Sequence, residues 1–338
     1  MGEGEFDLIA RLVERLPSTG EGLRIGSGDD AAVVDPGGRA TATTVDAVVE
    51  GVHFTLPEFP LEAVGRKALA AALSDLAAMG AEPGEAYVTL AAPGELGSDA
   101  LVAVADGVAA VAEREGVAIA GGDFTRGPAL ILAITCVGYE GSTPLVARAG
   151  AGDGEVLAVT GELGGAATAV ELLAAADAGD GQDANLSEAD RDRLLARQLD
   201  PRPRLAAGRA LAASGATAMI DVSDGLGADA GHLADASGVR LEIEFGRVPA
   251  APGLAAALGG ADGAERAVAS GGEDFELLAT LPAERFDAAR DAVAEAGTVL
   301  TQIGAARPGN GVALRRSDGS EVEAAGFDHR RGSRAGSA

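Results

Sequence analysis

Aspartates that follow short apolar runs are the side chains in this sequence best suited to chemistry. The first group is Gly26-Ser27-Gly28-Asp29-Asp30, whose glycines allow a sharp turn that points two carboxylates into one region. Two such charges about 4 Å apart repel by roughly 4 kcal/mol at a surface-like dielectric, so grouped carboxylates usually hold a cation. For this group alone, a solvated turn is the alternative. Recurrence favours the cation, because comparable aspartates follow at Asp46, Asp75, Asp123, Asp221 and Asp224.

Three of these aspartates, Asp46, Asp123 and Asp221, are expected at the carboxyl ends of apolar strands, the edge where α/β sheets bind ligands. No His/Cys cluster accompanies them in the sequence, so hard oxygen ligands predict Mg²⁺ or Mn²⁺ and not zinc. Mg²⁺ usually takes only one or two protein carboxylates and completes its shell with water and phosphate oxygens. So many aspartates therefore predict several metal ions and a phosphate-rich ligand, although the sequence has no P-loop, dinucleotide fingerprint or protein-kinase signature.

The elements that must position these aspartates follow from the apolar pattern. Helices are predicted over 6–16, 61–79, 98–116, 166–176, 227–236 and 287–296. Strands are predicted over 31–34, 40–45, 86–91, 117–120, 130–139, 155–160, 216–220, 239–245 and 277–281. Asp75 lies inside the amphipathic helix 61–79 although Asp is a poor helix former, which favours a role beyond solubility over a partly exposed position.

The length and composition indicate two domains. The chain has 338 residues, of which 47% are hydrophobic, enough for sizeable cores. We expect an α/β fold with an amino-terminal domain over 1–140, which carries most of the candidate metal ligands, and a carboxyl-terminal domain over 150–330. The glycine-rich stretch 141–154 is the expected boundary, and residues 331–338 are an expected loose tail.

The charge of the chain limits its partners. A net charge of -26 argues against binding nucleic acid, because phosphate backbones would be repelled. Dispersed acidity, few aromatic residues and a single lysine, Lys67, suggest a surface adapted to concentrated salt. Cys136 lies alone in an apolar run and is expected to be a buried small hydrophobe. An acidic beginning and no apolar run of membrane-spanning length predict a cytoplasmic protein with no membrane partner.

Taken together, the motifs resemble the thiamine-monophosphate kinase family. The matching segments run in order from Gly4-Glu5-Phe6 to Gly326-Phe327-Asp328-His329 and cover nearly the whole chain. Between these ends lie Gly26-Ser27-Gly28-Asp29-Asp30, Asp46 with Gly51-Val52-His53-Phe54, Leu73-Ser74-Asp75-Leu76-Ala77-Ala78-Met79-Gly80-Ala81, Gly121-Gly122-Asp123 with Thr125-Arg126-Gly127-Pro128, Ile220-Asp221-Val222-Ser223-Asp224-Gly225-Leu226, and Ser270-Gly271-Gly272-Glu273-Asp274-Phe275-Glu276-Leu277. The sequence lacks the cysteines of two sister families, selenophosphate synthetase and the hydrogenase-maturation dehydratase.

The resemblance implies a two-domain fold like that of aminoimidazole ribonucleotide synthetase, a homodimer formed through the amino-terminal sheets, and an ATP site bridged by Mg²⁺. It implies metal ligands at Asp30, Thr44, Val45, Asp46, Asp75, Asp123, Asp221 and Asp224. The family commonly has threonine where this chain has Val45, so a contact there would come from the backbone carbonyl. It implies ATP contacts from Gly122, Asp123, Arg148 and Ser223, and thiamine-phosphate contacts from His53, Glu273 and Phe327.

Several of these residues have structural alternatives. His53 is otherwise a loop histidine with satisfied hydrogen bonds, and Glu273, like Asp274, is otherwise a turn cap. Phe327 is otherwise a residue packed on a strand edge, although a flat aromatic ring also suits a cationic thiazolium. Arg148 is otherwise a surface ion pair, although its place at the domain junction favours phosphate binding.

The predicted activity is ATP-dependent phosphorylation of thiamine monophosphate to thiamine diphosphate. A phosphate monoester has a second pKa of about 6, so the acceptor oxygen is already ionised at neutral pH. No general base is therefore expected. The main barrier is repulsion between two polyanions, which bridging metals and in-line positioning would reduce, so direct transfer without a phosphoenzyme is predicted. Two alternatives stay open: a sister synthetase acting on another phosphate or carboxylate, and a non-catalytic nucleotide or metal sensor.

Overall fold

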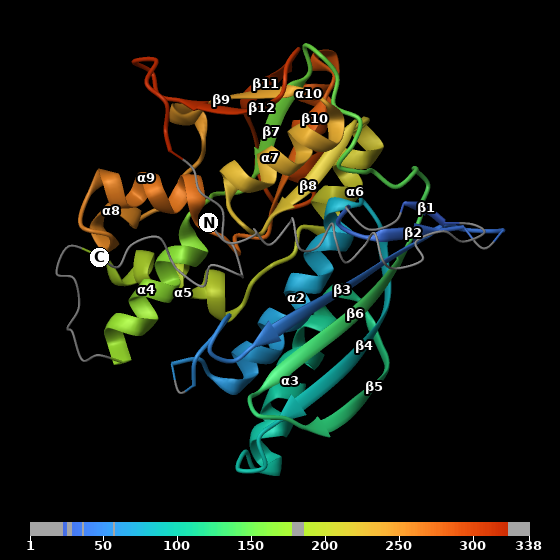
Figure 1. Cartoon of the computed structure of the whole chain (residues 1–338), viewed down its shortest axis with the longest axis vertical. Coiled ribbons are helices and arrows are strands. Elements are labelled where there is room, and N and C mark those ends of the chain that lie inside the picture. The colour runs from blue at the N-terminus through green and yellow to red at the C-terminus, as the bar shows by residue number, and fades with distance from the viewer. Residues whose placement is uncertain (1–22, 26–28, 36, 57, 178–185, 324–338) are drawn as a thin grey trace, which may run out of the picture.

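The computed structural model describes residues 23–25, 29–35, 37–56, 58–177 and 186–323. Within these ranges each half of the chain forms one six-stranded sheet, and helices pack between and around the two sheets (Figure 1). The predicted helix 6–16, the turn 26–28, Phe327 and the tail 331–338 lie outside the described residues. The stretch 141–154 contains neither helix nor strand.

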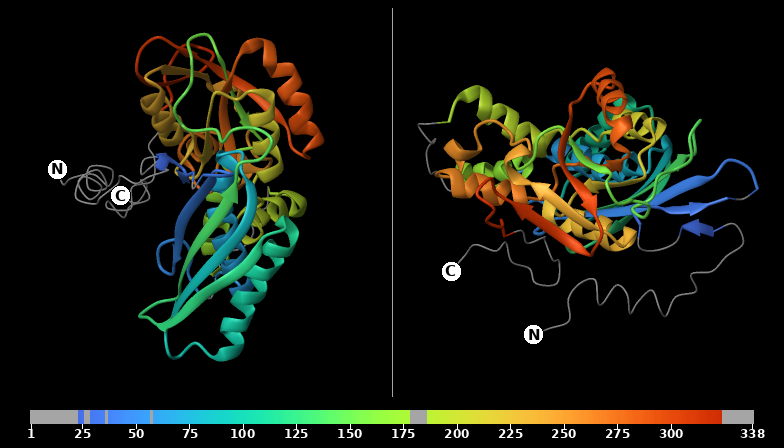
Figure 2. Two further views of the ribbon diagram at one scale, coloured as in Figure 1. Left: turned by 90° about the vertical axis from the view of Figure 1, so that its right-hand side faces the viewer. Right: turned by 90° about the horizontal axis from the view of Figure 1, so that it is seen from above.

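The first sheet is antiparallel except where β4 and β5 pair in parallel. Its strands in spatial order are β1 (Leu23–Ile25), β2 (Ala32–Val34), β3 (Thr41–Val49), β6 (Ile131–Tyr139), β4 (Glu82–Ala92) and β5 (Ala118–Arg126). Buried and partly exposed residues alternate along β6, so one face of the sheet meets the core. Helices α2 (Leu61–Ala78) and α3 (Ser98–Glu115) lie on that face, as the left view in Figure 2 shows.

Helix α2 lies between the two sheets and joins the halves of the molecule. It contacts β3 and β6 of the first sheet, and β8 and β10 of the second. The predicted single apolar face was wrong, because only Leu61, Glu62, Arg66 and Asp75 of this helix escape full burial. A helix covered on all sides needs apolar or small residues all round, which explains its alanine-rich sequence.

The second sheet is antiparallel except for β12 with β9. Its strands in spatial order are β12 (Gly311–Arg315), β9 (Arg240–Glu244), β11 (Leu300–Arg307), β7 (Val156–Thr160), β10 (Glu276–Leu281) and β8 (Ala218–Val222). The helices of this half are α4 (Gly165–Asp177), α5 (Glu188–Leu199), α6 (Leu205–Ser214), α7 (Leu226–Ser237), α8 (Leu254–Ala257), α9 (Ala261–Ser270) and α10 (Phe286–Glu295), with short 3-10 turns at Phe245–Arg247 and Ala283–Arg285.

Strands β7, β10 and β8 of this second sheet are buried on both faces, which is why they read as largely apolar runs in the sequence. Ala158 of β7 packs into the core that contains α2, whereas its neighbours Leu157 and Val159 pack into the core that contains α7. The same alternation along β8 fixes which of its side chains face α2 and the first half of the chain.

Two predicted strands are longer in the structure, and this moves two of the aspartates. Asp46 lies inside β3, because pairing with β6 continues to Val49. Asp123 lies inside β5, because parallel pairing with β4 continues to Arg126 and the glycines before Asp123 do not end the strand. The expectation of a carboxylate at a strand end was therefore wrong for Asp46 and Asp123, whereas Asp221 is next to the last residue of β8.

Candidate active site

Three carboxylates from distant segments meet where α2 lies between the halves of the molecule. They belong to Asp30 beside β2, Asp75 of α2 and Asp221 of β8, and one oxygen of each lies within 4.8 Å of the other two. Burial raises the pKa of Asp221 to about 8, and the charge of Asp30 adds to the rise. Burial and then the charges of Asp221 and Asp30 raise the pKa of Asp75 well above its ordinary value. A divalent cation would relieve this repulsion, and the all-oxygen donor set fits Mg²⁺.

Each carboxylate of this acidic cluster also accepts a hydrogen bond. Arg148 donates to both oxygens of Asp30, through Nε at 2.9 Å and Nη2 at 2.7 Å. The hydroxyl of Thr44 donates to Asp75, and that of Ser74 donates to Asp221 over 2.6 Å. Arg148 is the only cation among these partners, so one positive charge faces three carboxyl groups, and a divalent cation would favour the ionised form of Asp75 and Asp221.

A cavity of about 680 Å³ opens beside the cluster and is the size of a small-molecule site. Asp46 and Asp224 line it together with Asp75 and Asp221. The charge of Asp46 adds to the rise in the pKa of Asp75, and that of Asp224 adds to the rise for Asp221, so both carboxylates act on the cluster. The first half of the chain further contributes Val45 and His53, and the second half contributes Ser223 and Glu273.

The loop after β8 is held by a residue that sequence reasoning missed. Asp229 is buried in the first turn of α7, where one of its oxygens accepts the backbone N–H groups of Ser223, Asp224 and Gly225 at 3.0–3.1 Å. An acidic residue in a first helical turn is expected on chemical grounds. Nothing in the local sequence separates this buried aspartate from an ordinary surface one.

The segment before β10 is strained and tied to β8. Glu273 and Phe275 have φ angles of +67° and +51°, a left-handed conformation that costs a non-glycine residue roughly 1–3 kcal/mol. The N–H of Glu273 donates to the carbonyl of Ser223 over 2.8 Å, and that of Phe275 to the carbonyl of Val222 over 2.9 Å. The cavity wall therefore has a fixed backbone on this side.

Glu273 and Asp274 of this segment and Glu276, the first residue of β10, are anchored in different directions. The carboxylate of Glu273 binds Lys67 and Gln198, each through bonds of 2.7–2.8 Å. Asp274 accepts the backbone N–H groups of Gly164 and Ala166 at the start of α4, so it caps a helix. Glu276 is an ion-pair partner discussed below, and neither Glu273 nor Glu276 serves as a turn cap.

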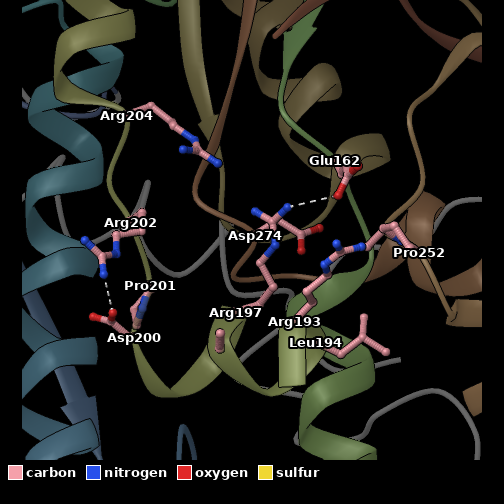
Figure 3. A pocket seen from close by; sticks show the side chains of 12 residues that line it. Glu162, Arg193, Leu194, Arg197, Asp200, Pro201, Arg202, Arg204, Pro252 and Asp274 are labelled. Carbon is pink, nitrogen blue, oxygen red and sulfur yellow. Dashed lines mark hydrogen bonds and ion pairs between the residues drawn. The ribbon is translucent and has the colours of Figure 1, made fainter. Parts of the chain in front are cut away.

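A second cavity, of about 350 Å³, lies behind this segment (Figure 3). Arg204 donates to both oxygens of the fully buried Glu276 at 2.6–2.7 Å, and Arg197 donates to one of them over 3.0 Å. Figure 3 shows Arg197 reaching from α5 toward Glu162. The ion pairs of Arg197 and Arg204 with Glu276 therefore hold the start of β10 in place.

Not every predicted site residue joins the acidic cluster. Gly122 pairs with Val88, which pairs through Ile134 with Asp46, so three strand spacings, or roughly 14 Å, separate the backbones of Asp46 and Gly122. Asp123 also faces the other side of the sheet, because it pairs with Thr89 and not with Val88. Within one chain, Asp123 therefore lies away from the acidic cluster.

Comparison with known proteins identifies the family of a chain with this fold and site. Residues 28–139 match the model of the AIR synthase related protein N-terminal domain, and residues 152–317 match that of the corresponding C-terminal domain. A thiamine-monophosphate kinase of Mycobacterium tuberculosis is 40% identical over 82% of this chain and 80% of its own length. The chain belongs to the thiamine-monophosphate kinase family.

Two further members of the thiamine-monophosphate kinase family match this chain over nearly its whole length. The enzyme of Halobacterium salinarum is 38% identical over 91% of this chain and 96% of its own length. The solved structure of AaThiL complexed with AMPPCP and TMP superimposes with a TM-score of 0.82 at 31% identity, covering 96% of this chain and 97% of that one. These matches confirm the expected two-domain architecture of the family.

Proposed function

We propose that this chain transfers the γ-phosphoryl group of ATP directly onto thiamine monophosphate and so forms thiamine diphosphate. The observation that carries the proposal is the meeting of Asp30, Asp75 and Asp221 beside a cavity built from both halves of the chain. The structure of AaThiL, which holds AMPPCP and TMP together, supports a site for a nucleotide and a second phosphate compound in this fold.

The acidic cluster fits Mg²⁺, and Asp30, Asp46, Asp75, Asp221 and Asp224 are the residues that would hold it. Bound metal would neutralise charge between the two polyphosphate substrates. Thr44 would orient the carboxylate of Asp75 through its hydrogen bond. Val45 lines the cavity, and its backbone carbonyl is the group that would act as a ligand there.

The remaining residues position the substrates. The Nδ1 atom of His53 accepts the N–H of Val49 over 3.0 Å, so a neutral ring carries its proton on Nε2, and this fixed ring would contact the acceptor substrate from the cavity wall. Ser223 would contact ATP from the loop that Asp229 orders. Arg148 binds Asp30 in this structure, so it would contact ATP from beside the acidic cluster. No general base is needed, because the acceptor oxygen is already ionised at neutral pH.

A homodimer through the first sheet is also part of the proposal. Large apolar side chains are exposed on β3, β4 and β5, among them Val45, Tyr87 and Phe124. Every residue of β5 is exposed, and β5 is the last strand of the sheet among the described residues. A second copy of the chain could therefore pair with this strand or pack over it. Because Asp123 lies away from the cluster of its own chain, we propose that it serves the cluster of a second copy.

We also propose a cellular compartment and a salt-adapted surface for this protein. The excess of 52 acidic over 26 basic residues favours a surface adapted to salt and a partner other than nucleic acid. Among the described residues, no helix combines the length and apolar character needed to cross a bilayer. We retain the cytoplasm as the proposed compartment.

The deciding experiment mixes purified protein with ATP, Mg²⁺ and thiamine monophosphate and measures thiamine diphosphate. The proposal predicts stoichiometric formation of thiamine diphosphate and ADP. Turnover of another phosphate or carboxylate alone would favour a sister synthetase, and nucleotide binding without turnover would favour a sensor. A phosphorylated side chain trapped during turnover would contradict direct transfer.

A further inference from the structure

The only lysine of the chain is buried and fully engaged. The side chain of Lys67 is 1% exposed, in the middle of α2. Its ammonium group donates to the carbonyl of His53 over 2.7 Å, to Oε1 of Gln198 over 2.9 Å and to the carboxylate of Glu273 over 2.8 Å. An ammonium group has three N–H donors, so these three acceptors use all of them.

The acceptors come from three separate segments. His53 follows β3 in the first half of the chain, Gln198 is near the end of α5, and Glu273 lies in the strained segment before β10. His53 and Glu273 line the large cavity, on opposite halves of the molecule. Lys67 is therefore bonded to both of these walls.

A second side chain closes this network. The amide nitrogen of Gln198 donates to the Glu273 carboxylate over 2.7 Å and to the carbonyl of Ala166 over 3.2 Å. Burial alone would raise the pKa of Glu273, but the charge of Lys67 and the hydrogen bonds from Lys67 and Gln198 bring it below its ordinary value. Glu273 therefore stays ionised at neutral pH, and its two oxygens have fixed directions.

The backbone conformation of Glu273 indicates that its ion pair with Lys67 does more than fill space in the core. Glu273 has a φ angle of +67°, a conformation that persists only where the surroundings enforce it. Lys67 supplies part of that enforcement from α2, through its 2.8 Å ion pair with Glu273. Loss of its charge would leave the partly exposed carboxylate of Glu273 with Gln198 but without its ion-pair partner. At this strained position the segment would then relax.

We propose that Lys67 is a positioning residue for the acceptor substrate, which sets the spacing between Glu273 and the His53 loop across the cavity. The proposal rests on the proposed function in one respect, namely that thiamine monophosphate is the molecule these two walls contact. The acidic cluster is built from other residues, so Lys67 should affect the acceptor and leave the nucleotide side unchanged.

Steady-state kinetics of Lys67→Met test this separation, since methionine has a similar length and no charge. We expect the KM for thiamine monophosphate to rise by about tenfold or more while the KM for ATP stays within about twofold. Arg66→Met is the matched control, because Arg66 directly precedes Lys67 in α2 and donates to the carbonyl of Leu199, which is on neither cavity wall. Equal changes in both KM values, or none in folded Lys67→Met, would overturn the proposal.

If Lys67→Met fails to fold, Gln198→Leu weakens the same network and the same split in KM is expected. The single lysine also permits a measurement that needs no activity, because ¹⁵N-lysine labelling gives one side-chain Nζ signal. We expect this signal to shift on adding thiamine monophosphate and in Glu273→Gln, and to stay in place on adding the ATP analogue AMPPCP.

The network would be contradicted if the Nζ signal did not shift in Glu273→Gln, or if the Nζ protons exchanged with water as fast as those of an exposed amine. If the wild-type protein makes no thiamine diphosphate, the proposed function fails, whereas the response of Nζ to Glu273→Gln still decides whether Lys67 holds this wall.

Discussion

The hydroxyl of Ser74 on α2 donates a 2.6 Å hydrogen bond to Oδ2 of Asp221 at the end of β8. Both residues are buried, and they belong to different halves of the chain. The bond therefore sets one carboxylate of the second half against Asp75, which follows Ser74 directly. The acidic cluster exists only when α2 is seated against the second sheet, so cation binding and the packing of the two halves are linked.

Ser74→Ala should weaken cation binding more than it weakens the fold. Ser74 lowers the pKa of Asp221 against the larger effect of burial, so its loss makes Asp221 harder to ionise. We expect the Mg²⁺ concentration for half-maximal activity to rise by about three- to tenfold, the equivalent of one net hydrogen bond. Ser187→Ala is the control, since Ser187 caps α5 far from the cluster. An unchanged Mg²⁺ midpoint in Ser74→Ala would contradict this role.

The pH dependence of stability should change sign with Mg²⁺. The pKa of Asp221, about 8 in the folded protein, exceeds the value of about 3.9 expected when unfolded, so between these values the folded state binds more protons. The metal-free free energy of unfolding should therefore fall as pH rises from about 5 to about 8. Asp274, whose pKa burial raises to about 7, acts in the same direction.

Denaturant unfolding in EDTA and in saturating Mg²⁺ measures this effect. Mg²⁺ requires the ionised carboxylates, so its stabilisation should grow over the same pH range. Asp221→Asn should flatten the metal-free curve in part and leave the contribution of Asp274. A metal-free protein that gains stability toward about pH 8 would refute the assignment.

Much of the fold was predictable because local signals determine it. The helices predicted over 61–79 and 98–116 from apolar spacing and from glycines at their ends are observed as Leu61–Ala78 and Ser98–Glu115. Helices α8 and α9 were missed, since α8 is only four residues long and the stretch around Gly259 and Gly260 is rich in glycine and alanine, as loops often are. Strands β3 and β5 were drawn too short, because their lengths depend on partners distant in sequence.

The site likewise contains residues that the sequence predicts and residues that it does not. The motifs single out Asp30, Asp75 and Asp221 because short sequence patterns carry them. The partners that orient the site could not be predicted, because they are non-local: Arg148 reaches Asp30 across 118 residues and Lys67 reaches Glu273 across 206. Pairing at such separations follows from how α2 seats between the sheets, which no local pattern specifies.

Asp229→Ala should loosen the loop that carries Ser223 and Asp224. Removal of the carboxylate leaves three backbone N–H groups without their acceptor, so we expect faster amide hydrogen exchange at residues 223–225 and about a tenfold loss in kcat/KM for ATP. Asp235→Ala is the control, because Asp235 is an exposed residue of the same helix. Exchange rates unchanged in Asp229→Ala would show that the loop is ordered by other contacts.

Complementation between two inactive variants tests whether Asp123 acts on a second copy of the chain. Asp123→Ala and Asp75→Ala should each lose nearly all activity alone, since each lacks one metal-binding candidate. In a mixed dimer whose sites combine Asp75 of one chain with Asp123 of the other, one of the two sites is intact. Random mixing should therefore restore about a quarter of the wild-type activity.

If both residues serve the same chain, every site in the mixed dimer lacks one of them and no activity returns. The roughly 14 Å between the backbones of Asp46 and Gly122, and the opposite faces of Asp46 and Asp123, favour the first outcome. Light scattering on the same mixture establishes that dimers are present. A monomeric wild-type protein with full activity would contradict the shared site, because the exposed β5 would then have no partner to serve.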